Sequence, residues 1–184
     1  MRKSKSNVVL FLGGARSGKS ALAEKIVSAN RDVAYIATAK AIDEEMKERI
    51  RKHKRNRPSN WITFEVEGQL QNTLRQALGK IDTVIIDCLT IYVARRMEET
   101  ANDDEIIDEI VHVVKEAGQT GKTVIIVSNE VGMGLVPDYP SGRRYRDLLG
   151  IVNQKVAEYA DKVLLTIAGI PVDIKSLSSN FDGF

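Results

Sequence analysis

Short apolar runs and amphipathic stretches alternate along this chain. Six runs rich in Val, Ile and Leu lie at 8–12, 33–37, 62–66, 83–87, 123–127 and 162–168. Several are apolar at nearly every position, which is typical of strands buried on both faces of a parallel sheet. Helical patterns fill the intervals near 19–29, 42–55, 68–78, 103–117 and 142–160. Strands that alternate with helices predict an α/β fold.

The end of the pattern predicts one change of strand direction. After the run at 162–168, Gly169 and Pro171 favour a tight turn before the last apolar segment. A parallel connection needs a long crossover, so this final strand must run antiparallel to its neighbour. We expect a mostly parallel sheet of about seven strands with an antiparallel C-terminal edge strand.

Length and composition limit the class of protein. The 184 residues fit a single domain, 1–184, in which 1–6 read as a frayed N-terminus. The single cysteine, Cys88, excludes a disulfide framework and indicates a reducing compartment. No apolar run is long enough for a membrane span, and no signal-peptide core follows the basic start. These features predict a cytoplasmic protein.

Positive and negative charges are nearly balanced over the whole chain, but positive charge is concentrated in one segment. Lysine plus arginine number 27 and aspartate plus glutamate 25, which gives no general basic field for nucleic acid. The run "RIRKHKRNRP" at 49–58 carries six cations and no acid. Such a cluster suits a small polyanion such as a nucleotide, and its alternative is a solvated helix face.

A phosphate-binding motif follows the first apolar run. The stretch matches G-x-x-x-x-G-K-[ST], with a strand before it and an amphipathic helix after it: Gly13, Gly14, Ala15, Arg16, Ser17, Gly18, Lys19 and Ser20. Its backbone N–H groups and the helix N-terminus can surround phosphate oxygens. Lys19 would reach the β and γ phosphates, and the Ser20 hydroxyl would ligate Mg²⁺.

Asp87 is the expected partner of this motif. It ends the apolar run at 83–87, where a carboxylate can hold Mg²⁺ directly or through water. Its alternative role is to cap the next helix. Cys88 beside it reads as a small packed residue rather than a nucleophile.

One of the two histidines lies on the basic helix. His112 reads as a surface residue, whereas His53 shares an apolar stripe with Ile42, Met46 and Ile50. A histidine on such a stripe is often packed or capping. The surrounding cations would attract phosphate and favour neutral imidazole, which could attack an α-phosphorus and retain the nucleotidyl group. Spacing permits this reaction without requiring it.

Together these segments resemble one known family. "GGARSGKS", "YIATA", "DEEMKERIRKHKRNRPSNW", "DCLT", "VSNEVGMGLVP" and "RRYRDLLGIVNQKVAEYADKVLLTIAGIPVDIK" resemble the bifunctional adenosylcobinamide kinase/adenosylcobinamide-phosphate guanylyltransferase of cobalamin assembly. The match runs in order from Val8 to about Lys175. The phosphate loop alone is unspecific, but its combination with the histidine helix and the two later segments is highly specific.

The resemblance implies two reactions and a fold. ATP or GTP would phosphorylate the aminopropanol hydroxyl of adenosylcobinamide. GTP would then guanylylate a histidine, and GMP would pass to adenosylcobinamide phosphate, giving adenosylcobinamide-GDP. The implied fold is a three-layer P-loop NTPase (RecA-like) domain, and the implied partners are these substrates within a homo-oligomer, expected to be a trimer, with no nucleic acid.

The resemblance also assigns site residues. The guanylylated histidine corresponds to His53, between Arg49 and Pro58; some members have two adjacent histidines, but Lys52 precedes it here. The implied nucleotide contacts are Thr38, Ala39, Lys40, Lys54, Arg55, Asn56, Arg57 and Pro58. Glu65 is expected near the guanosine and Asp87 near the metal.

Two further segments lie near the expected ligand edge. Ser128, Asn129 and Glu130 follow a strand and should emerge at the carboxyl edge of the sheet, unless they form a plain turn. Arg143, Arg144 and Arg146 begin the last long helix and are either phosphate or corrinoid contacts or ordinary surface charge. Later in that helix, Leu148, Leu149, Val152, Val156 and Tyr159 read as core.

Two other functions remain open from the sequence. One is a monofunctional P-loop small-molecule kinase in which His53 is structural. The other is an ATP-driven RecA-like motor or nucleic-acid module, which the near-neutral charge and the lack of an aromatic stacking surface disfavour.

Overall fold

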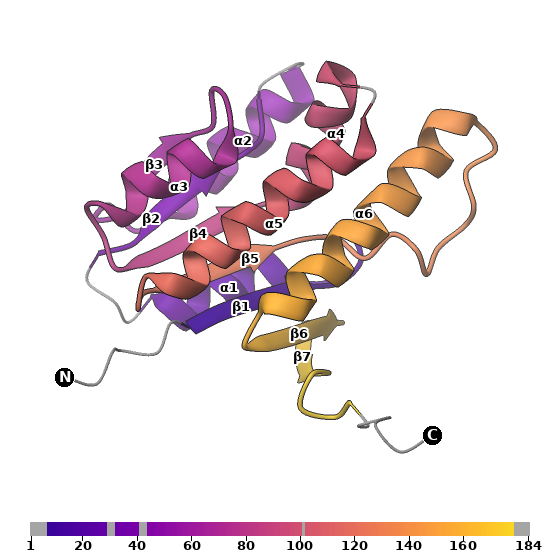
Figure 1. The fold of residues 1–184 in the computed structure, drawn as a ribbon. Helices are drawn as coiled ribbons and strands as arrows, with labels where there is room; N and C mark the ends of the chain where they lie inside the picture. The colour runs from indigo at the N-terminus through magenta and orange to yellow at the C-terminus, as the bar shows by residue number, and fades with distance from the viewer. Residues whose placement is uncertain (1–6, 29–31, 41–43, 101, 179–184) are drawn as a thin grey trace.

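The computed structural model describes residues 7–28, 32–40, 44–100 and 102–178 (Figure 1). The elements in chain order are β1 (Asn7–Leu12), α1 (Lys19–Val27), β2 (Ala34–Ala37), α2 (Glu44–Asn56), β3 (Ile62–Glu65), α3 (Leu70–Leu78), β4 (Thr83–Asp87), α4 (Leu89–Glu99), α5 (Asp103–Gln119), β5 (Thr123–Val127), α6 (Pro140–Tyr159), β6 (Lys162–Ile167) and β7 (Ile170–Asp173). The predicted strands are confirmed to within about two residues at their ends.

The strands form one sheet in the order β3-β2-β4-β5-β1-β6-β7. Each pairing among β1 to β6 is parallel, and β6 pairs with β7 antiparallel. The expected mostly parallel sheet of about seven strands with an antiparallel edge strand is therefore confirmed. The two-residue connection between Ile167 and Ile170 leaves no room for a crossover, so the chain must reverse there.

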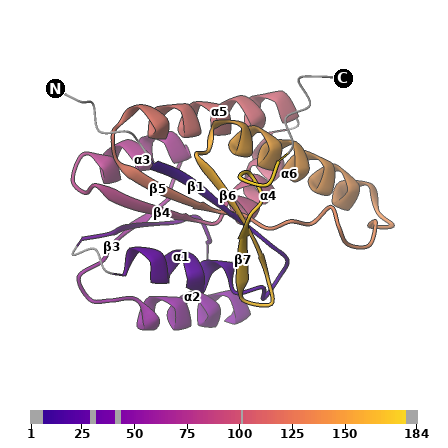
Figure 2. The same cartoon turned by 90° about the horizontal axis from the view of Figure 1, so that it is seen from below.

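Helices cover both faces of the sheet. Figure 2 shows α1 and α2 on one face and α3, α5 and α6 on the other. Helix α4 packs against α5 and α6. This arrangement is the three-layer α/β architecture that the family resemblance implies.

The core is divided by the sheet because strand side chains alternate between its faces. Val8 and Leu10 of β1 join the cluster under α3, α5 and α6, whereas Val9 and Phe11 join the cluster under α1. Burying each such side chain stabilises the fold by about 1.5–3 kcal/mol. Because the central strands contribute side chains to both clusters, they are apolar at nearly every position.

Two sequence interpretations are wrong. Helix α4 was not expected, because "LTIYV" directly after a strand has the β-branched and aromatic character of a strand. Its buried Leu89, Tyr92 and Val93 have helical spacing. Tyr159, the last residue of α6, is 37% exposed rather than core. The expected position of Ile42 lies outside the described residues.

The topology brings several loops to one edge. The carboxyl ends of β1, β2, β4, β5 and β6 all face the same way, because these strands are parallel. Ligands of open α/β sheets bind at this edge. Within the described ranges, no helix is both long and apolar enough to cross a membrane.

Candidate active site

The phosphate loop joins β1 to α1. Gly18 has a φ of 93° and Gly13 a φ of 154°, conformations that side-chain-bearing residues rarely adopt. A Cβ atom on Gly13 would lie 2.5 Å from the Thr166 carbonyl oxygen, so only glycine fits. The glycines of the motif therefore set the path of the loop.

The turn between β6 and β7 holds this loop. The Gly169 N–H donates to the Ser17 carbonyl at 2.8 Å, and a Cβ on Gly18 would be 3.2 Å from the Gly169 Cα. Across the loop, the Glu130 N–H donates to the Gly13 carbonyl at 3.1 Å. The loop is thus fixed by segments from the far end of the chain before any ligand binds.

Lys19 lies against the phosphate loop. Its side chain is 8% exposed, and its Nζ donates to the Gly14 carbonyl at 3.1 Å. Burial lowers the pKa of Lys19, while Cys88 and Asp87 oppose that shift. A buried ammonium group that bonds a carbonyl of the phosphate loop is placed to receive phosphate oxygens.

Asp87 is held on both carboxylate oxygens. Its Oδ1 accepts from Ser20 Oγ at 3.3 Å, and its Oδ2 accepts from Tyr35 Oη at 2.5 Å. The N-cap position of α4 belongs to Cys88, so the interpretation of Asp87 as a helix cap is wrong. Cys88 is a free cysteine that forms no disulfide. Burial raises the pKa of its thiol to about 11, which makes it a poor nucleophile.

Ser20 and Asp87 fit a magnesium ion. A hydroxyl and a carboxylate oxygen converge, and both are hard oxygen ligands. Among the described residues, no group of three or more His, Cys, Asp or Glu side chains could hold a metal by itself. This donor set matches Mg²⁺, which is usually bound by one or two protein oxygens together with phosphates and water.

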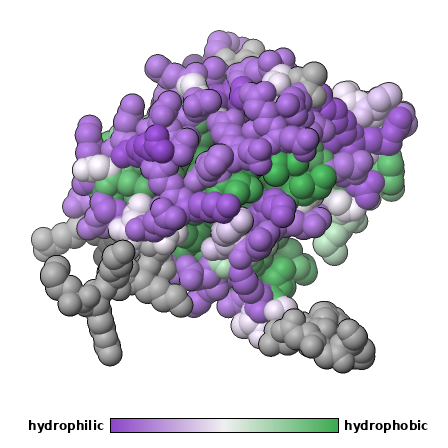
Figure 3. Space-filling model, viewed as in Figure 1, coloured by the Kyte–Doolittle hydropathy of each residue, from purple (hydrophilic) through white to green (hydrophobic). Residues whose placement is uncertain are grey.

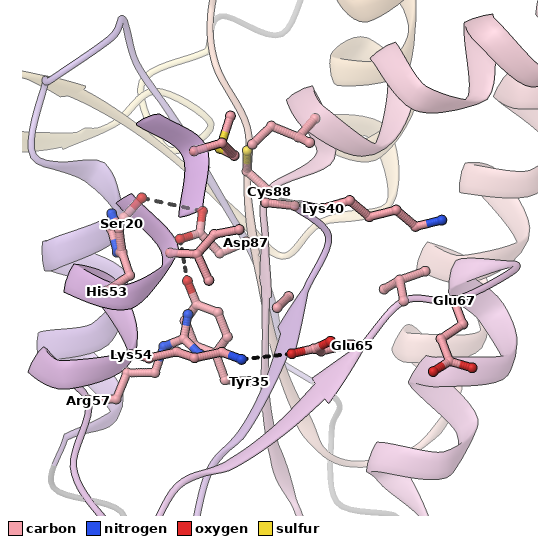
Figure 4. Close-up of a pocket in the computed structure, with 16 residues that line it drawn as sticks. Ser20, Tyr35, Lys40, His53, Lys54, Arg57, Glu65, Glu67, Asp87 and Cys88 are labelled. Atoms are coloured by element: carbon pink, nitrogen blue, oxygen red, sulfur yellow. Dashed lines mark hydrogen bonds and ion pairs between the residues drawn. The ribbon is translucent and has the colours of Figure 1, made fainter. Parts of the chain in front are cut away.

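His53 faces the same cavity as these two residues. The cavity of about 440 Å³ lies between α1, α2 and the ends of β2, β3 and β4, and Ser20, Tyr35, His53 and Asp87 line it (Figure 4). The imidazole is exposed rather than packed in the core, so the interpretation of His53 as a packed residue is wrong, whereas a capping role stays a prediction. His112 is exposed on α5, as expected.

Lys54 and Arg57 continue the wall that α2 gives to the cavity. Lys54 forms an ion pair with Glu65 of β3 at 2.7 Å, which Figure 4 shows across the cavity. The Arg57 guanidinium lies 3.4 Å from the centre of the Tyr35 ring, and its Nη1 donates to Thr63 Oγ1 at 3.2 Å. Tyr35 therefore connects the end of α2 to Asp87.

The other predicted contacts are divided between the cavity and its surroundings. Ala39 and Lys40 line the cavity. Thr38 is buried, and its hydroxyl bonds both the N–H and the carbonyl of Cys88 at 2.8 Å. Arg55 instead pairs with Glu48 at 2.9 Å, and Pro58 lines a neighbouring depression. The side chain of Asn56 lies outside what the structure describes.

The later segments have contacts inside the chain. Ser128 is fully buried, and the Asn129 N–H donates to Thr90 Oγ1 at 2.8 Å. Arg143 and Arg146 donate to backbone carbonyls of the loop before α6, and Arg144 pairs with Asp103 at 2.6 Å. These arginines hold the start of α6 and its preceding loop.

Two residues of the site escaped the sequence analysis. Tyr35 looked like an ordinary strand residue. Glu24 lies four residues after Ser20, on the same side of α1, and is half-buried near Asp87 and His53. This i, i+4 relation was the signal that could have found Glu24.

A three-layer α/β fold, a glycine-bounded loop after β1 and an acid at the end of β4 define a P-loop nucleotide-binding protein. Residues 9–174 match the family model described as cobinamide kinase / cobinamide phosphate guanyltransferase. The chain belongs to this family, CobU, which confirms the resemblance noted in the sequence.

Curated relatives agree with this assignment. The chain is 37% identical to the bifunctional adenosylcobalamin biosynthesis protein CobU of Salmonella typhimurium over 180 residues, covering 91% of this chain and 99% of that protein. It is 34% identical to the Escherichia coli protein of the same name, over 91% and 99% of the two chains. It is 39% identical to the Pseudomonas aeruginosa protein CobP, over 90% and 96%.

A solved structure supports the fold. A KaiC-like protein from Pyrococcus horikoshii OT3 superposes with a TM-score of 0.53 and 14% identity, covering 88% of this chain and 71% of that one. The P-loop fold class is thereby confirmed.

Proposed function

We propose that this chain phosphorylates adenosylcobinamide with ATP or GTP and then transfers GMP from GTP to the product through a guanylylated His53. The observation that carries the proposal is that α2 presents His53 to the cavity that Ser20 and Asp87 also line. A monofunctional kinase would not need an exposed imidazole at the phosphate site.

The phosphate loop would serve both reactions. Its backbone N–H groups and Lys19 would hold the triphosphate, and Ser20 with Asp87 would hold Mg²⁺. Bound there, the ion would neutralise charge on the phosphates. Residues 13–20 would thus position the γ-phosphorus for the corrinoid hydroxyl in one reaction and the α-phosphorus for His53 in the other.

The guanylyl transfer would proceed in two steps, in each of which one bond to phosphorus forms and another breaks. In the first, an imidazole nitrogen of His53 bonds the α-phosphorus while the bond to the bridging oxygen breaks, and pyrophosphate leaves. In the second, a phosphate oxygen of adenosylcobinamide phosphate bonds the same phosphorus and the N–P bond breaks. Adenosylcobinamide-GDP is released and neutral imidazole is restored.

The Lys54–Glu65 pair would contact the base. It offers a donor and an acceptor 2.7 Å apart on the cavity wall. Guanine presents an acceptor at O6 and donor N–H groups on its adjacent edge, so it complements this pair, and adenine has the opposite polarity. This complementarity supports GTP as the guanylyl donor.

Covalent labelling tests the proposal. Wild-type protein given α-³²P-GTP should retain acid-labile, base-stable label after denaturation, and His53→Asn should retain none while still phosphorylating adenosylcobinamide. His112→Asn is the matched control and should label normally. Label on His53→Asn, or its absence from wild-type protein, would overturn the proposal.

The family resemblance also supports a homo-oligomer, which we propose to be a trimer. The face in Figure 3 is largely hydrophilic, with hydrophobic patches that include one near β6 and β7. Ile167 and Ile170 there are 60% and 66% exposed, and Leu135 in the loop before α6 is 97% exposed. Light scattering with size-exclusion chromatography measures the assembly, and a monomer would exclude it.

A further inference from the structure

Glu24 carries a carboxylate oxygen that has no partner. The residue lies on α1 one turn after Ser20, so its side chain shares the helix face that borders the cavity. Its Oε1 is fully buried and has no hydrogen bond within the described part of the chain. A buried acceptor without a donor is costly and indicates a missing interaction.

The groups that surround Glu24 come from three other elements. Asp87 of β4 and Tyr35 of β2 interact with it, and His53 and Arg57 approach from α2. Burial and Asp87 raise the pKa of Glu24, whereas His53 and Arg57 lower it. His53 and Arg57 are therefore near enough to Glu24 to interact with its carboxylate.

The other carboxylates around the cavity are already engaged or distant. Asp87 accepts from Ser20 and Tyr35, and Glu65 pairs with Lys54. Glu67 lies on the opposite side of the cavity from His53 (Figure 4). The Arg57 guanidinium contacts the Tyr35 ring and Thr63, and its Nε, which is buried, has no hydrogen-bond partner within the described part of the chain. Of these carboxylates, Glu24 is the one with an oxygen available to an imidazole N–H.

We propose that Glu24 is a positioning residue for His53, accepting a hydrogen bond from the imidazole nitrogen that does not attack GTP. The inference rests on the proposed function of His53 as the nucleophile. Nucleophilic imidazole must keep its proton on the distal nitrogen, and an acceptor there fixes the tautomer and the ring orientation.

The carboxylate also has a role in the charge balance of the step. When one nitrogen bonds the α-phosphorus and pyrophosphate departs, the ring that still holds its distal proton becomes positively charged. A carboxylate hydrogen-bonded to that N–H stabilises the charge without taking part in bond formation. When the acceptor phosphate displaces the histidine, the ring returns to its neutral form and the same hydrogen bond persists.

Single-turnover labelling of Glu24→Gln tests this role. With saturating GTP, the rate of covalent GMP formation should fall by roughly 10²–10⁴, as when the orienting acid of a catalytic triad is removed. Glu24→Asp should recover part of the rate, and phosphorylation of adenosylcobinamide should be unchanged. Glu98→Gln, which removes an exposed carboxylate on α4, is the matched control.

The outcomes separate this inference from the proposed function. Label on His53→Asn would overturn the proposed function itself, and with it this inference. If His53→Asn is unlabelled but Glu24→Gln guanylylates at the wild-type rate, only the role of Glu24 is overturned. Equal loss of both activities with a lower melting temperature would make Glu24 a structural residue and would also overturn its positioning role.

Discussion

Asp87 receives one hydrogen bond on each carboxylate oxygen, so its orientation is fixed by two neighbours before a ligand arrives. Ser20 belongs to the phosphate loop motif, whereas Tyr35 belongs to a strand and carries no motif. Burial and Asp87 raise the pKa of Tyr35, so the phenol remains a donor. Tyr35 is thus a support for the acid that we propose as a metal ligand.

Tyr35→Phe should weaken the use of Mg²⁺. Loss of the 2.5 Å hydrogen bond leaves the Asp87 Oδ2 without its donor, so the carboxylate can rotate away from Ser20. Removing such a supporting contact typically costs about 10–100-fold in metal affinity. The Mg²⁺ concentration for half-maximal guanylyl transfer should rise accordingly, and Tyr159→Phe on α6 should leave it unchanged. An unaltered Mg²⁺ dependence in Tyr35→Phe would contradict the role of Tyr35.

Lys19→Ala should impair both reactions, because both need the triphosphate on one loop. Removing an electrostatic anchor of this kind costs on the order of 10²–10³ in rate. Lys25→Ala, an exposed lysine in the last turn of the same helix, is the control. Phosphorylation and GMP labelling are assayed separately, and undiminished labelling in Lys19→Ala would exclude a shared phosphate loop.

At the scale of elements, the pattern of apolar residues was sufficient to predict the strands and most of the helices. Strands with side chains in both core clusters must be continuously apolar, as in Ile85, Ile86, Ile125 and Ile126. Helix α4 was missed because Cys88 is the only residue between it and β4, so no turn signal separates them. Its helical state depends on packing against α5 and α6, which a local pattern does not contain.

The residues of the candidate site were predictable where they belong to a sequence motif or to the apolar stripe of a helix. Residues 13–20 follow from glycine and lysine spacing, and the orientation of His53 toward the cavity follows from its stripe with Met46 and Ile50. The contacts of Glu24 and Tyr35 were not predictable, because they depend on how α1, α2 and β2 meet. The partners of the arginines at the start of α6, which are backbone carbonyls and Asp103, were likewise not predictable from the sequence.

The β6–β7 turn offers a stabilising substitution. Ala168 and Gly169 have φ values of 50° and 81°, as a two-residue type I′ turn requires, and alanine tolerates this conformation poorly. Ala168→Asn should raise the melting temperature by about 2–4 °C, because asparagine is the favoured residue at that position. Ala168→Val should lower it, because β-branched side chains disfavour positive φ. Calorimetry measures both, and the reverse order of melting temperatures would contradict this explanation.

At the scale of the molecule, stability should fall at alkaline pH through Tyr145. Its hydroxyl donates to the Thr90 carbonyl at 3.2 Å and ties α6 to α4. Burial raises the pKa of Tyr145 from 10.0 to about 12, with Cys88 contributing. Between these values the folded state holds a proton that the unfolded state has lost. The stabilisation is therefore complete below about pH 10 and is lost as the pH approaches 12, a change on the order of 2 kcal/mol.

Urea unfolding between pH 8 and pH 11 measures this effect. Tyr145→Phe should be less stable than wild type near neutral pH by about 1 kcal/mol, because its hydrogen bond is absent. Its free energy of unfolding should then decline less steeply above pH 10. Tyr139→Phe, at an exposed tyrosine, should keep the wild-type slope. Parallel slopes for Tyr145→Phe and wild type would assign the alkaline loss to other groups.

Because the phosphate loop is attached to the β6–β7 turn, it can be completed only after the chain has been synthesised as far as that turn. β1 lies between β5 and β6, and the Val8 N–H bonds the carboxylate of Asp161, 153 residues later. Translation proceeds at about 5–20 residues per second, so the segments that brace the loop are synthesised roughly 7 to 30 seconds after it. A ribosome-bound chain that has not yet exposed Gly169 therefore lacks a finished nucleotide site.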